Sequence, residues 1–289
     1  MYALFTDTDT DITPIEAEKF GYHLISMPYC IDGKEIYPYQ DFTISDYKTF
    51  YGNMRKGVIP KTEGISPAKY KNYFEPFFKN GQDVLYVHFS AAMSGTFNAM
   101  EIARQELKEV YPERDIYTVD TKAISIGSLN IVKEIGEMYK DGKSIKEIQD
   151  WARIEVGRFA TYFFANDLKF FKRTGRVKGI KAFMGDLLGI KPIINMNSDG
   201  IMDSIDKVKG IKGAMEKIVY YVSNLQEDIF NHRVMIAHSD NIELAEELAM
   251  RLKAEFSESL PIEFVVVNPT AGSHCGPESI GVSFHAKHR

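Results

Sequence analysis

Cysteine is scarce in this sequence, with two residues, Cys30 and Cys275, in a chain of 289. Two distant cysteines form neither a disulfide framework nor the closely spaced ligand set of a zinc site, so we expect no bound metal. No apolar run approaches the length of about 20 residues that crosses a bilayer, and we expect no integral membrane association. The chain enters an apolar segment, Tyr2–Thr6, without the basic region and apolar core of a signal peptide. We therefore expect a cytoplasmic protein.

Positive charge is not in excess either. The 35 Lys and Arg against 40 Asp and Glu leave a formal net charge of −5, and the sequence pI is ≈ 5.9. Nucleic-acid binders usually carry a basic surplus, so we expect no nucleic-acid partner. The absence of a P-loop and of a G-x-G-x-x-G fingerprint argues against a nucleotide-binding enzyme or kinase. The apolar share of 44% is enough for a real core, and the length suits two domains or one large one.

The segment Asp83–Val110 organises the chain, because it combines a short apolar run, a polar loop and an amphipathic helical pattern. Ser94 is placed to cap the predicted helix, with Gly95 just inside it. A helix start presents unpaired N–H groups and a partial positive charge, and the hydroxyls of Ser90, Ser94 and Thr96 add to them. The loop suits an anion, although an ordinary capped crossover fits the same residues.

Strand and helix patterns alternate through the first half of the chain, which predicts a parallel sheet with helices on both faces. The strands expected there are Tyr2–Phe5, His23–Cys30, Val84–Phe89 and Asp115–Val119, with a hairpin turning at Asp32 and Gly33. The helices expected there are Pro14–Phe20, Ser45–Met54, one that starts at Pro67, Ser125–Tyr139 and Ile145–Val156.

The second half has a different pattern, with strands and helices that do not alternate regularly. Its expected strands are Ala160–Ala165, Ile193–Met196, Gly200–Ile205, Arg233–His238, Ile262–Val267 and Gly281–His285, with helices over Gly210–Leu225 and Ile242–Phe256. We therefore predict an α/β protein of two domains, a parallel-sheet domain over residues 1–157 and an α+β domain over residues 158–289.

Three acidic residues, Asp7, Asp9 and Asp11, follow the first strand at alternate positions. Their spacing resembles a calcium-binding loop, but the glycine expected at the sixth position is missing and Glu18 does not complete the pattern. The favoured interpretation is local: Asp and Thr side chains bond nearby backbone and cap the helix that follows.

The chain as a whole resembles the DegV family of bacterial fatty-acid-binding proteins. The matching blocks, which occur in family order over nearly the whole chain, are Asp7–Ile12, Pro60–Thr62, Ser94–Phe97, Val119–Thr121, Lys172–Val177, Gly189–Ile194 and His274–Pro277. The resemblance implies two α/β domains with one long-chain fatty acid in a buried tunnel between them. It also implies a non-catalytic role, in which the protein presents the fatty-acid carboxylate to a partner fatty acid kinase that makes an acyl phosphate. No cofactor is implied beyond the fatty acid itself.

The resemblance places the carboxylate contacts on Thr62, on Ser94 with the neighbouring backbone of Gly95, and near His274. The residues themselves favour Ser94, which lies at a predicted helix start. His274 taken alone is more often an ordinary loop histidine, although the glycines around it allow close backbone approach. Two departures from the family pattern, Glu63 after the binding-loop threonine and Glu278 after the His-x-Gly-Pro block, bear on the head-group geometry.

The free energy available from burying an acyl chain is large enough for a fatty acid to be the ligand. A buried methylene contributes about 0.8 kcal/mol, so a sixteen-carbon chain offers on the order of 12 kcal/mol before ordering costs. The head group then needs only hydroxyls and N–H groups, without an arginine at the site. Candidate tunnel residues, each of which also fits a plain core, are Phe89, Phe159, Phe163, Phe164, Phe170, Phe171, Phe183, Met184 and Leu187.

A basic segment interrupts this acidic protein between Asp167 and Asp186. It consists of Lys169, Lys172, Arg173, Arg176, Lys178 and Lys181. A solvated face is the usual explanation of such a run. The alternative is a docking patch for an acidic partner, or for the phosphate being transferred, and Arg173 and Arg176 are the candidate docking residues.

A serine hydrolase is the competing hypothesis. Ser94 would be the nucleophile, His274 the base, and Asp7 or Asp120 the residue that orients it. The G-x-S-x-G elbow of such enzymes is not matched, because the residue two before Ser94 is Ala92.

Overall fold

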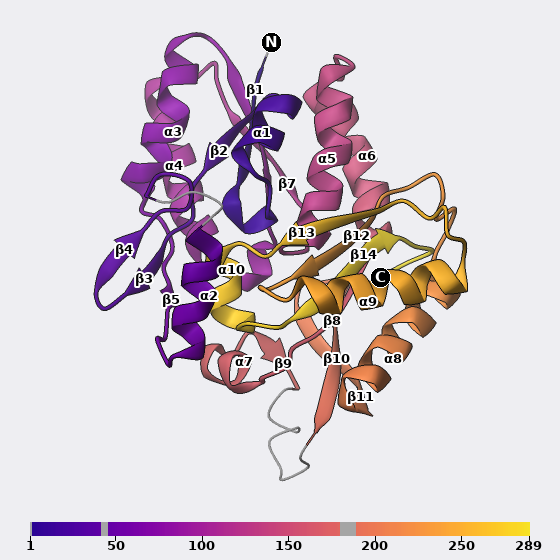
Figure 1. Cartoon of the computed structure of the whole chain (residues 1–289). Helices are drawn as coiled ribbons and strands as arrows, with labels where there is room; N and C mark the ends of the chain where they lie inside the picture. The colour runs from indigo at the N-terminus through magenta and orange to yellow at the C-terminus, as the bar shows by residue number, and fades with distance from the viewer. Residues whose placement is uncertain (1, 42–45, 180–188) are drawn as a thin grey trace.

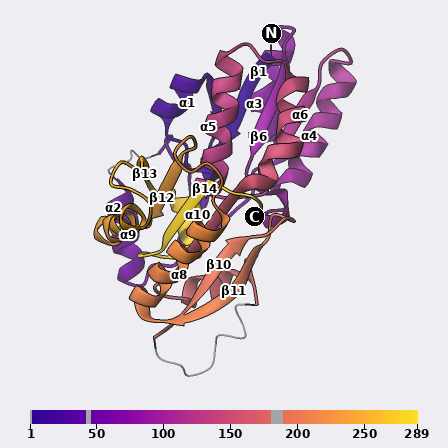
Figure 2. The same cartoon turned by 90° about the vertical axis from the view of Figure 1, so that its right-hand side faces the viewer.

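The computed structural model describes residues 2–41, 46–179 and 189–289. A parallel four-stranded sheet forms the upper part of the molecule in Figure 1, in the order β2-β1-β6-β7. Its strands are β1 (Tyr2–Asp7), β2 (Tyr22–Ile25), β6 (Asp83–His88) and β7 (Ile116–Asp120). Its helices are α1 (Pro14–Phe20), α3 (Pro67–Lys79), α4 (Thr96–Val110), α5 (Ile126–Lys140) and α6 (Ile145–Glu155). The helices α3 and α4 lie on one side of the sheet and α5 and α6 on the other (Figures 1 and 2), so the expected α/β arrangement is confirmed.

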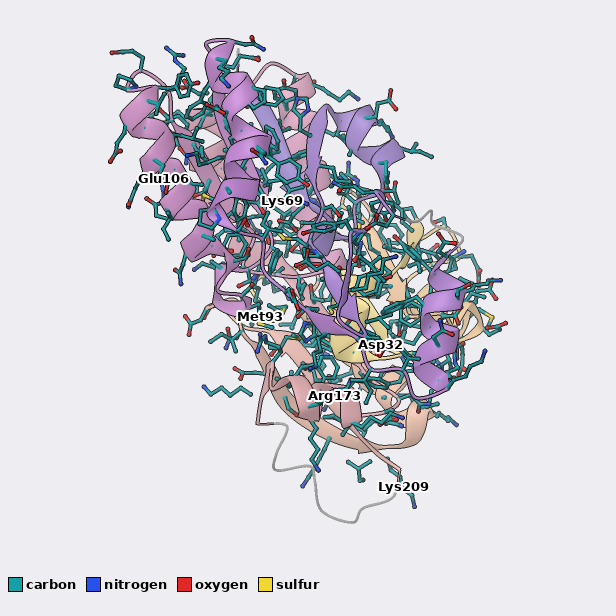
Figure 3. The ribbon with its side chains drawn as sticks, turned by 90° about the vertical axis from the view of Figure 1, so that its left-hand side faces the viewer. Asp32, Lys69, Met93, Glu106, Arg173 and Lys209 are labelled. Carbon is teal, nitrogen blue, oxygen red and sulfur yellow. The ribbon has the colours of Figure 1, made fainter. Side chains whose placement is uncertain are left out.

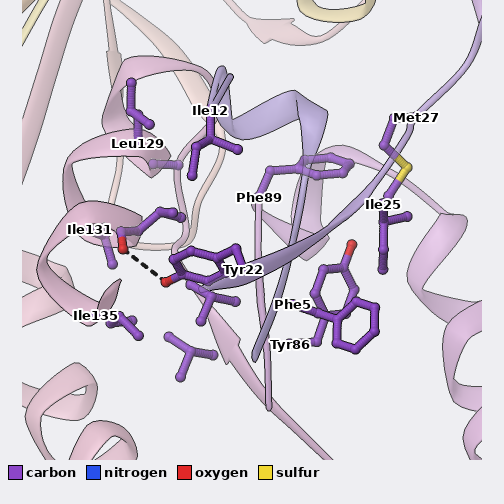
Figure 4. Packing of buried hydrophobic residues seen from close by; sticks show 14 of the residues in the cluster. Phe5, Ile12, Tyr22, Ile25, Met27, Tyr86, Phe89, Leu129, Ile131 and Ile135 are labelled. Atoms are coloured by element: carbon purple, nitrogen blue, oxygen red, sulfur yellow. Dashed lines mark hydrogen bonds between the residues drawn. The ribbon is translucent and has the colours of Figure 1, made fainter. Parts of the chain in front are cut away.

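Aromatic and branched side chains fill the space between this sheet and its helices. Phe5 on β1 packs edge-on against Phe74 of α3, with ring centroids 5.1 Å apart. On the other side, Tyr22 is buried and its hydroxyl donates to the carbonyl of Val132 on α5 at 2.9 Å (Figure 4). The tyrosine therefore satisfies its one polar group inside an apolar layer.

A mixed seven-stranded sheet forms the second layer, in the order β13-β12-β14-β8-β10-β11-β9. Its strands are β8 (Phe159–Phe164), β9 (Val177–Lys178), β10 (Ile190–Met196), β11 (Met202–Lys209), β12 (Val234–His238), β13 (Ile262–Val266) and β14 (Ile280–His285). Two amphipathic helices, α8 (Gly210–Leu225) and α9 (Ile242–Glu255), cover one face of it. The strands of the first sheet all precede residue 157 and those of the second all follow it. The domain boundary itself stays a prediction.

The helix α5 joins the two sheets. Ten consecutive or nearly consecutive residues of this helix are buried, from Ile126 to Gly136, and it contacts η1 (Thr8–Thr10) as well as β8, β12 and β14. A helix that is buried all round lies between layers rather than on a surface. One continuous apolar cluster accordingly runs from the first sheet through α5 to residues of the second sheet, such as Ile194 and Met202.

A small third layer lies beside this junction. It consists of an antiparallel sheet in the order β4-β3-β5 and three short helices. Its elements are β3 (Tyr29–Ile31), β4 (Lys34–Ile36), β5 (Lys61–Thr62), α2 (Tyr47–Arg55), α7 (Lys169–Thr174) and α10 (Pro269–Cys275). The hairpin predicted at Asp32 and Gly33 is confirmed.

Three details differ from expectation. The single strand expected over His23–Cys30 is two strands, β2 and β3, which belong to different sheets. The segment around His274, expected as a loop, is the helix α10. Ser45, the first residue of the helix expected over Ser45–Met54, lies outside the described residues, and Asp46 occupies the position before the helix α2. In the part of the chain that the structure describes, no helix is long and apolar enough to cross a membrane.

Candidate functional site

Two cavities meet between the layers. The polar cavity is lined by Asp9, Thr62, Glu63, Phe89, Met93, Ser94, Gly95, Thr96, Arg176, Thr270 and His274, among others. The apolar cavity is lined mainly by Phe163, Phe171, Met196, Ala237, Val267, Ala271 and Ile280. Ile124, Met202 and His274 belong to both linings. The free volume inside the apolar cavity is ≈ 70 Å³, which is below the roughly 300–1,000 Å³ of sites that hold a drug-sized ligand.

The polar cavity is accessible from the surface. Glu63, Gly95 and Arg176 at its rim are exposed, whereas Asp9 and Thr96 are buried. In the view of Figure 3, the cavity residue Met93 lies above Arg173 of α7. The four residues predicted to hold a carboxylate, Thr62, Ser94, Gly95 and His274, all line this one cavity. Their role as carboxylate ligands stays a prediction.

The helix α10 carries His274 into the junction. Asn268 caps it by accepting from the N–H of Thr270 at 2.8 Å, and Pro269 occupies its first turn. Two glycines let it pack closely: a Cβ on Gly272 would lie 2.3 Å from the Tyr51 hydroxyl, and one on Gly276 would lie 2.1 Å from Phe170. Contacts with distant side chains therefore hold a helix whose sequence is not strongly helical.

His274 is an uncharged histidine bonded to Thr62. Its Nε2 lies 2.9 Å from the Thr62 hydroxyl oxygen. Burial lowers the pKa of His274 to about 4, with a further contribution from the positive charges of Arg176 and Arg173. Nδ1 of the ring is buried and has no hydrogen-bond partner among the described residues. The neutral imidazole therefore keeps one ring nitrogen for a further group at the junction of the two cavities.

The start of α4 forms another part of the polar cavity. Gly95, not Ser94, is the residue before the helix, and as a glycine it has no side chain that could cap it. The Ser94 hydroxyl instead accepts from the Thr96 N–H at 3.2 Å. The expectation that Ser94 is the cap with Gly95 inside the helix is therefore wrong by one residue. The two residues still place a hydroxyl and the first N–H groups of α4 at the cavity wall.

The three hydroxyls expected in this loop have separate roles. Thr96 accepts from the Ile65 N–H at 3.2 Å and so holds the segment after Thr62 against α4. Ser90 does not line the polar cavity: its hydroxyl donates to the carbonyl of Gly200 at 2.8 Å, which joins the end of β6 to the β10–β11 turn. Only Ser94 and Thr96 of the three belong to the cavity.

The loop Asp7–Asp11 brings one of its residues, Asp9, to the lining of the polar cavity. Burial raises the pKa of Asp7 to about 7, although the Tyr86 hydroxyl donates to it at 2.9 Å. Burial also raises the pKa of Asp11 to about 7, although Ser125 and the Asn268 N–H donate to it. The expectation that an Asp or Thr side chain of this stretch caps α1 is confirmed, because Thr13 forms a reciprocal pair with Glu16. Among the described residues no three His, Cys, Asp or Glu side chains are arranged to hold a metal ion.

Some of the charged residues near the opening of the polar cavity line it, and others do not. Arg176 lines the polar cavity, whereas Arg173 is exposed on α7 and packs over the Phe170 ring at 5.4 Å. An arginine at the site was not expected from the sequence. Glu63 also lines the cavity but is exposed. Glu278 points elsewhere, because it accepts from Asn166 at 2.7 Å and lies 3.8 Å from Arg55.

The candidate tunnel residues are only partly at the cavities. Phe163 and Phe171 line the apolar cavity and Phe89 the polar one. Phe159, Phe164 and Phe170 are buried in the core. Phe183, Met184 and Leu187, with Lys181 of the basic segment, lie outside the described residues. Most of the apolar lining consists instead of aliphatic residues such as Met196 and Met202, whose role sequence reasoning did not single out.

The side chains proposed for a serine hydrolase do not form a catalytic triad. His274 is bonded to Thr62 rather than to Ser94. Asp7 accepts from Tyr86 and from the Phe89 N–H. Asp120 accepts from the Lys122 N–H at 2.7 Å. The described side chains therefore contain no relay from a carboxylate through His274 to Ser94.

The fold is that of an α/β protein in which a polar and an apolar cavity share lining residues between the layers. The chain belongs to the DegV family, because the model of that family, described as uncharacterised, matches residues 1–287. A DegV domain-containing protein of Clostridium perfringens is 33% identical over 287 residues, covering 98% of this chain and 97% of the relative.

Solved structures agree with this membership. A fatty acid binding DegV family protein from Streptococcus agalactiae superposes with a TM-score of 0.83 at 25% identity, covering 100% of this chain and 99% of that one. A stearic acid-binding protein from Eubacterium ventriosum shares the fold, with a TM-score of 0.86 at 20% identity and 99% of each chain covered.

Proposed function

We propose that the protein binds one long-chain fatty acid, with its carboxylate in the polar cavity and its acyl chain in the apolar cavity. The observation that carries the proposal is the junction of the two cavities at Ile124, Met202 and His274. A polar compartment open to the surface and continuous with an apolar interior suits a ligand with one charged end. The similar protein of Streptococcus agalactiae, described as fatty-acid-binding, supports the same ligand class.

The head group would be held by uncharged donors. The Ser94 hydroxyl, the N–H groups at the start of α4 and either Thr62 or His274 face the polar cavity. Hydrogen bonds from such groups to a carboxylate contribute about 1.5–3 kcal/mol each. Arg176 at the rim adds a positive charge near the same place. The acyl chain would supply most of the affinity by leaving water.

We further propose that the protein presents this carboxylate to a partner kinase rather than reacting with it. The exposed rim supports access for a second protein, and the exposed arginines Arg173 and Arg176 beside it support docking of an acidic surface. The identity of this partner rests on the family resemblance.

Mass spectrometry of an organic extract of the purified protein tests the ligand. We expect a long-chain fatty acid at about one per chain, and a rise in melting temperature when fatty acid is added to lipid-free protein. A lipid-free extract together with no thermal stabilisation would contradict the proposal. An activated-serine probe that labels Ser94 would favour the hydrolase instead.

A further inference from the structure

Asp9 is the buried acidic residue in the lining of the polar cavity. It is 7% exposed and lines the cavity. Its Oδ1 has no hydrogen-bond partner within residues 2–41, 46–179 and 189–289. Its neighbours in the same loop differ, because Asp7 and Asp11 each accept from backbone N–H groups and from a hydroxyl. A buried carboxyl oxygen without a partner is costly unless a ligand supplies one.

A negative charge on Asp9 would conflict with the proposed ligand. Two carboxylates in one buried compartment repel each other, and such pairs share a proton in proteins. The backbone around Asp9 fixes it in place: its N–H donates to Asp7 at 3.0 Å and its carbonyl accepts from the Ser125 N–H at 2.8 Å. The carboxyl group therefore has to meet the head group as an acid.

We propose that Asp9 holds a proton and donates it in a hydrogen bond to the carboxylate of the bound fatty acid, so that the complex contains one proton shared between two carboxyl groups. This inference rests on the proposed function and adds a residue that determines which head group and which ionisation state the site accepts. No proton leaves the pair; where Asp9 is ionised in the free protein, binding takes up one proton from water.

The surrounding charges favour the protonated form. Burial raises the pKa of Asp9 well above its usual range, and the charges of Asp7 and Asp11 raise it further. The titratable and charged groups that face Asp9 or share its cavity are Asp7 and Asp11 from its own loop, Tyr70 from α3, Tyr86 from β6, Glu63 after β5, His274 from α10 and Arg176 after α7. Of these, His274 is neutral near pH 7.

The consequence is a binding reaction that depends on pH in one direction. Below the pKa of Asp9 the affinity for a carboxylate is constant. Above it, affinity falls by about tenfold per pH unit, because each binding event has to protonate Asp9. A fatty alcohol can donate to ionised Asp9, so its affinity lacks this fall.

Isothermal titration of lipid-free protein tests the inference, with decanoate and decan-1-ol as probes. Titration in buffers of different ionisation enthalpy reports the protons taken up. We expect uptake to approach one per decanoate at alkaline pH and to be absent for decan-1-ol. Asp9→Asn keeps a donor and cannot ionise, so it should bind decanoate with no Asp9-dependent uptake. Glu278→Gln, which removes a carboxylate that points away from the cavity toward Asn166 and Arg55, should keep the uptake.

The outcomes separate the two claims. Decanoate binding with the same proton uptake in the native protein and in Asp9→Asn would overturn the role of Asp9, whereas failure of the native protein to bind either decanoate or the long-chain palmitate at any pH would overturn the proposed function itself. Should Asp9→Asn not fold, the native complex with ¹³C-carboxyl decanoate still decides. Infrared difference spectra should show the unlabelled carbonyl stretch of a protonated side chain, and its absence would contradict the inference.

Discussion

His274 Nε2 and the Thr62 hydroxyl are bonded at 2.9 Å across 212 residues of sequence, which fastens α10 to the small sheet at the wall of the polar cavity. Thr62→Val should therefore affect stability as well as binding, because it leaves a buried ring nitrogen without a partner. We expect a loss of about 1–3 kcal/mol in the free energy of unfolding, measured by urea denaturation of lipid-free protein. Thr62→Ser keeps the hydroxyl and is the matched control; equal losses in both variants would show that the hydrogen bond is not the cause.

Ser94→Ala should act mainly on the ligand. Its hydroxyl accepts from the Thr96 N–H, so the variant should lose up to about 1 kcal/mol of stability. It should lose about 1.5–3 kcal/mol of fatty-acid affinity as one hydrogen bond to a charged group disappears. Comparing titrations with a fatty acid and with its methyl ester separates the contribution of the carboxylate to affinity from that of the acyl chain. An unchanged preference for the acid in Ser94→Ala combined with Thr62→Val would place the head group elsewhere.

Much of the fold could be predicted from the sequence, because the long elements carry their own pattern. The helix α8 spans Gly210–Leu225 as expected, since its apolar spacing is regular. The helix α10 could not be predicted, because its sequence around Gly272 has weak helix preference and contacts with Tyr51 and Phe170 hold it.

The candidate site, like the fold, could be predicted only in part from the sequence. Ser94 carried a local signal, a hydroxyl at a helix start. No local signal predicts that His274 reaches Thr62, or that Arg176 rather than Arg173 lines the cavity. Family resemblance supplied Thr62 and His274 as candidates. The carboxyl group of Asp9 has no local signal either, because its special property is a missing partner in the folded chain.

The pH dependence of the free energy of unfolding should show whether Asp9 is protonated in the folded protein. An Asp whose pKa is raised on folding stabilises the protein fully below its unfolded pKa of about 3.9 and loses that contribution as pH rises toward the folded value. The raised pKa of Asp9 therefore predicts that Asp9→Asn matches the native protein near about pH 4 and becomes relatively more stable as pH rises, by at most about 1.4 kcal/mol per unit. Urea denaturation of lipid-free protein across this range measures the difference; a difference independent of pH would show that Asp9 is ionised in the folded chain.

The two arginines should separate in function. Arg173→Glu lies away from the cavity lining, so we expect fatty-acid affinity to stay and production of acyl phosphate by the partner kinase to slow, as it should on adding salt. Arg176→Glu lines the cavity and should weaken both. Titration and a coupled kinase assay measure the two effects, and a loss of lipid binding in Arg173→Glu would refute the docking role.

The close packing of α10 should make its glycines sensitive. Gly272→Ala places a Cβ 2.3 Å from the Tyr51 hydroxyl, so we expect a loss of about 1–3 kcal/mol in the free energy of unfolding. Gly213→Ala in α8 meets Val208 at an ordinary 3.5 Å and should stabilise by about 0.5–1 kcal/mol, as alanine does within a helix. Denaturation of both variants tests the contrast, which would fail if Gly272→Ala were neutral.

A crystal structure of the protein with a bound long-chain fatty acid tests the central claim most directly. The account predicts one acyl chain in the apolar cavity, past Ile124 and Met202, with its carboxylate within hydrogen-bond reach of Ser94, of Asp9 and of Thr62 or His274. A fatty acid bound outside these two cavities, or bound with its head group at the apolar end, would contradict it.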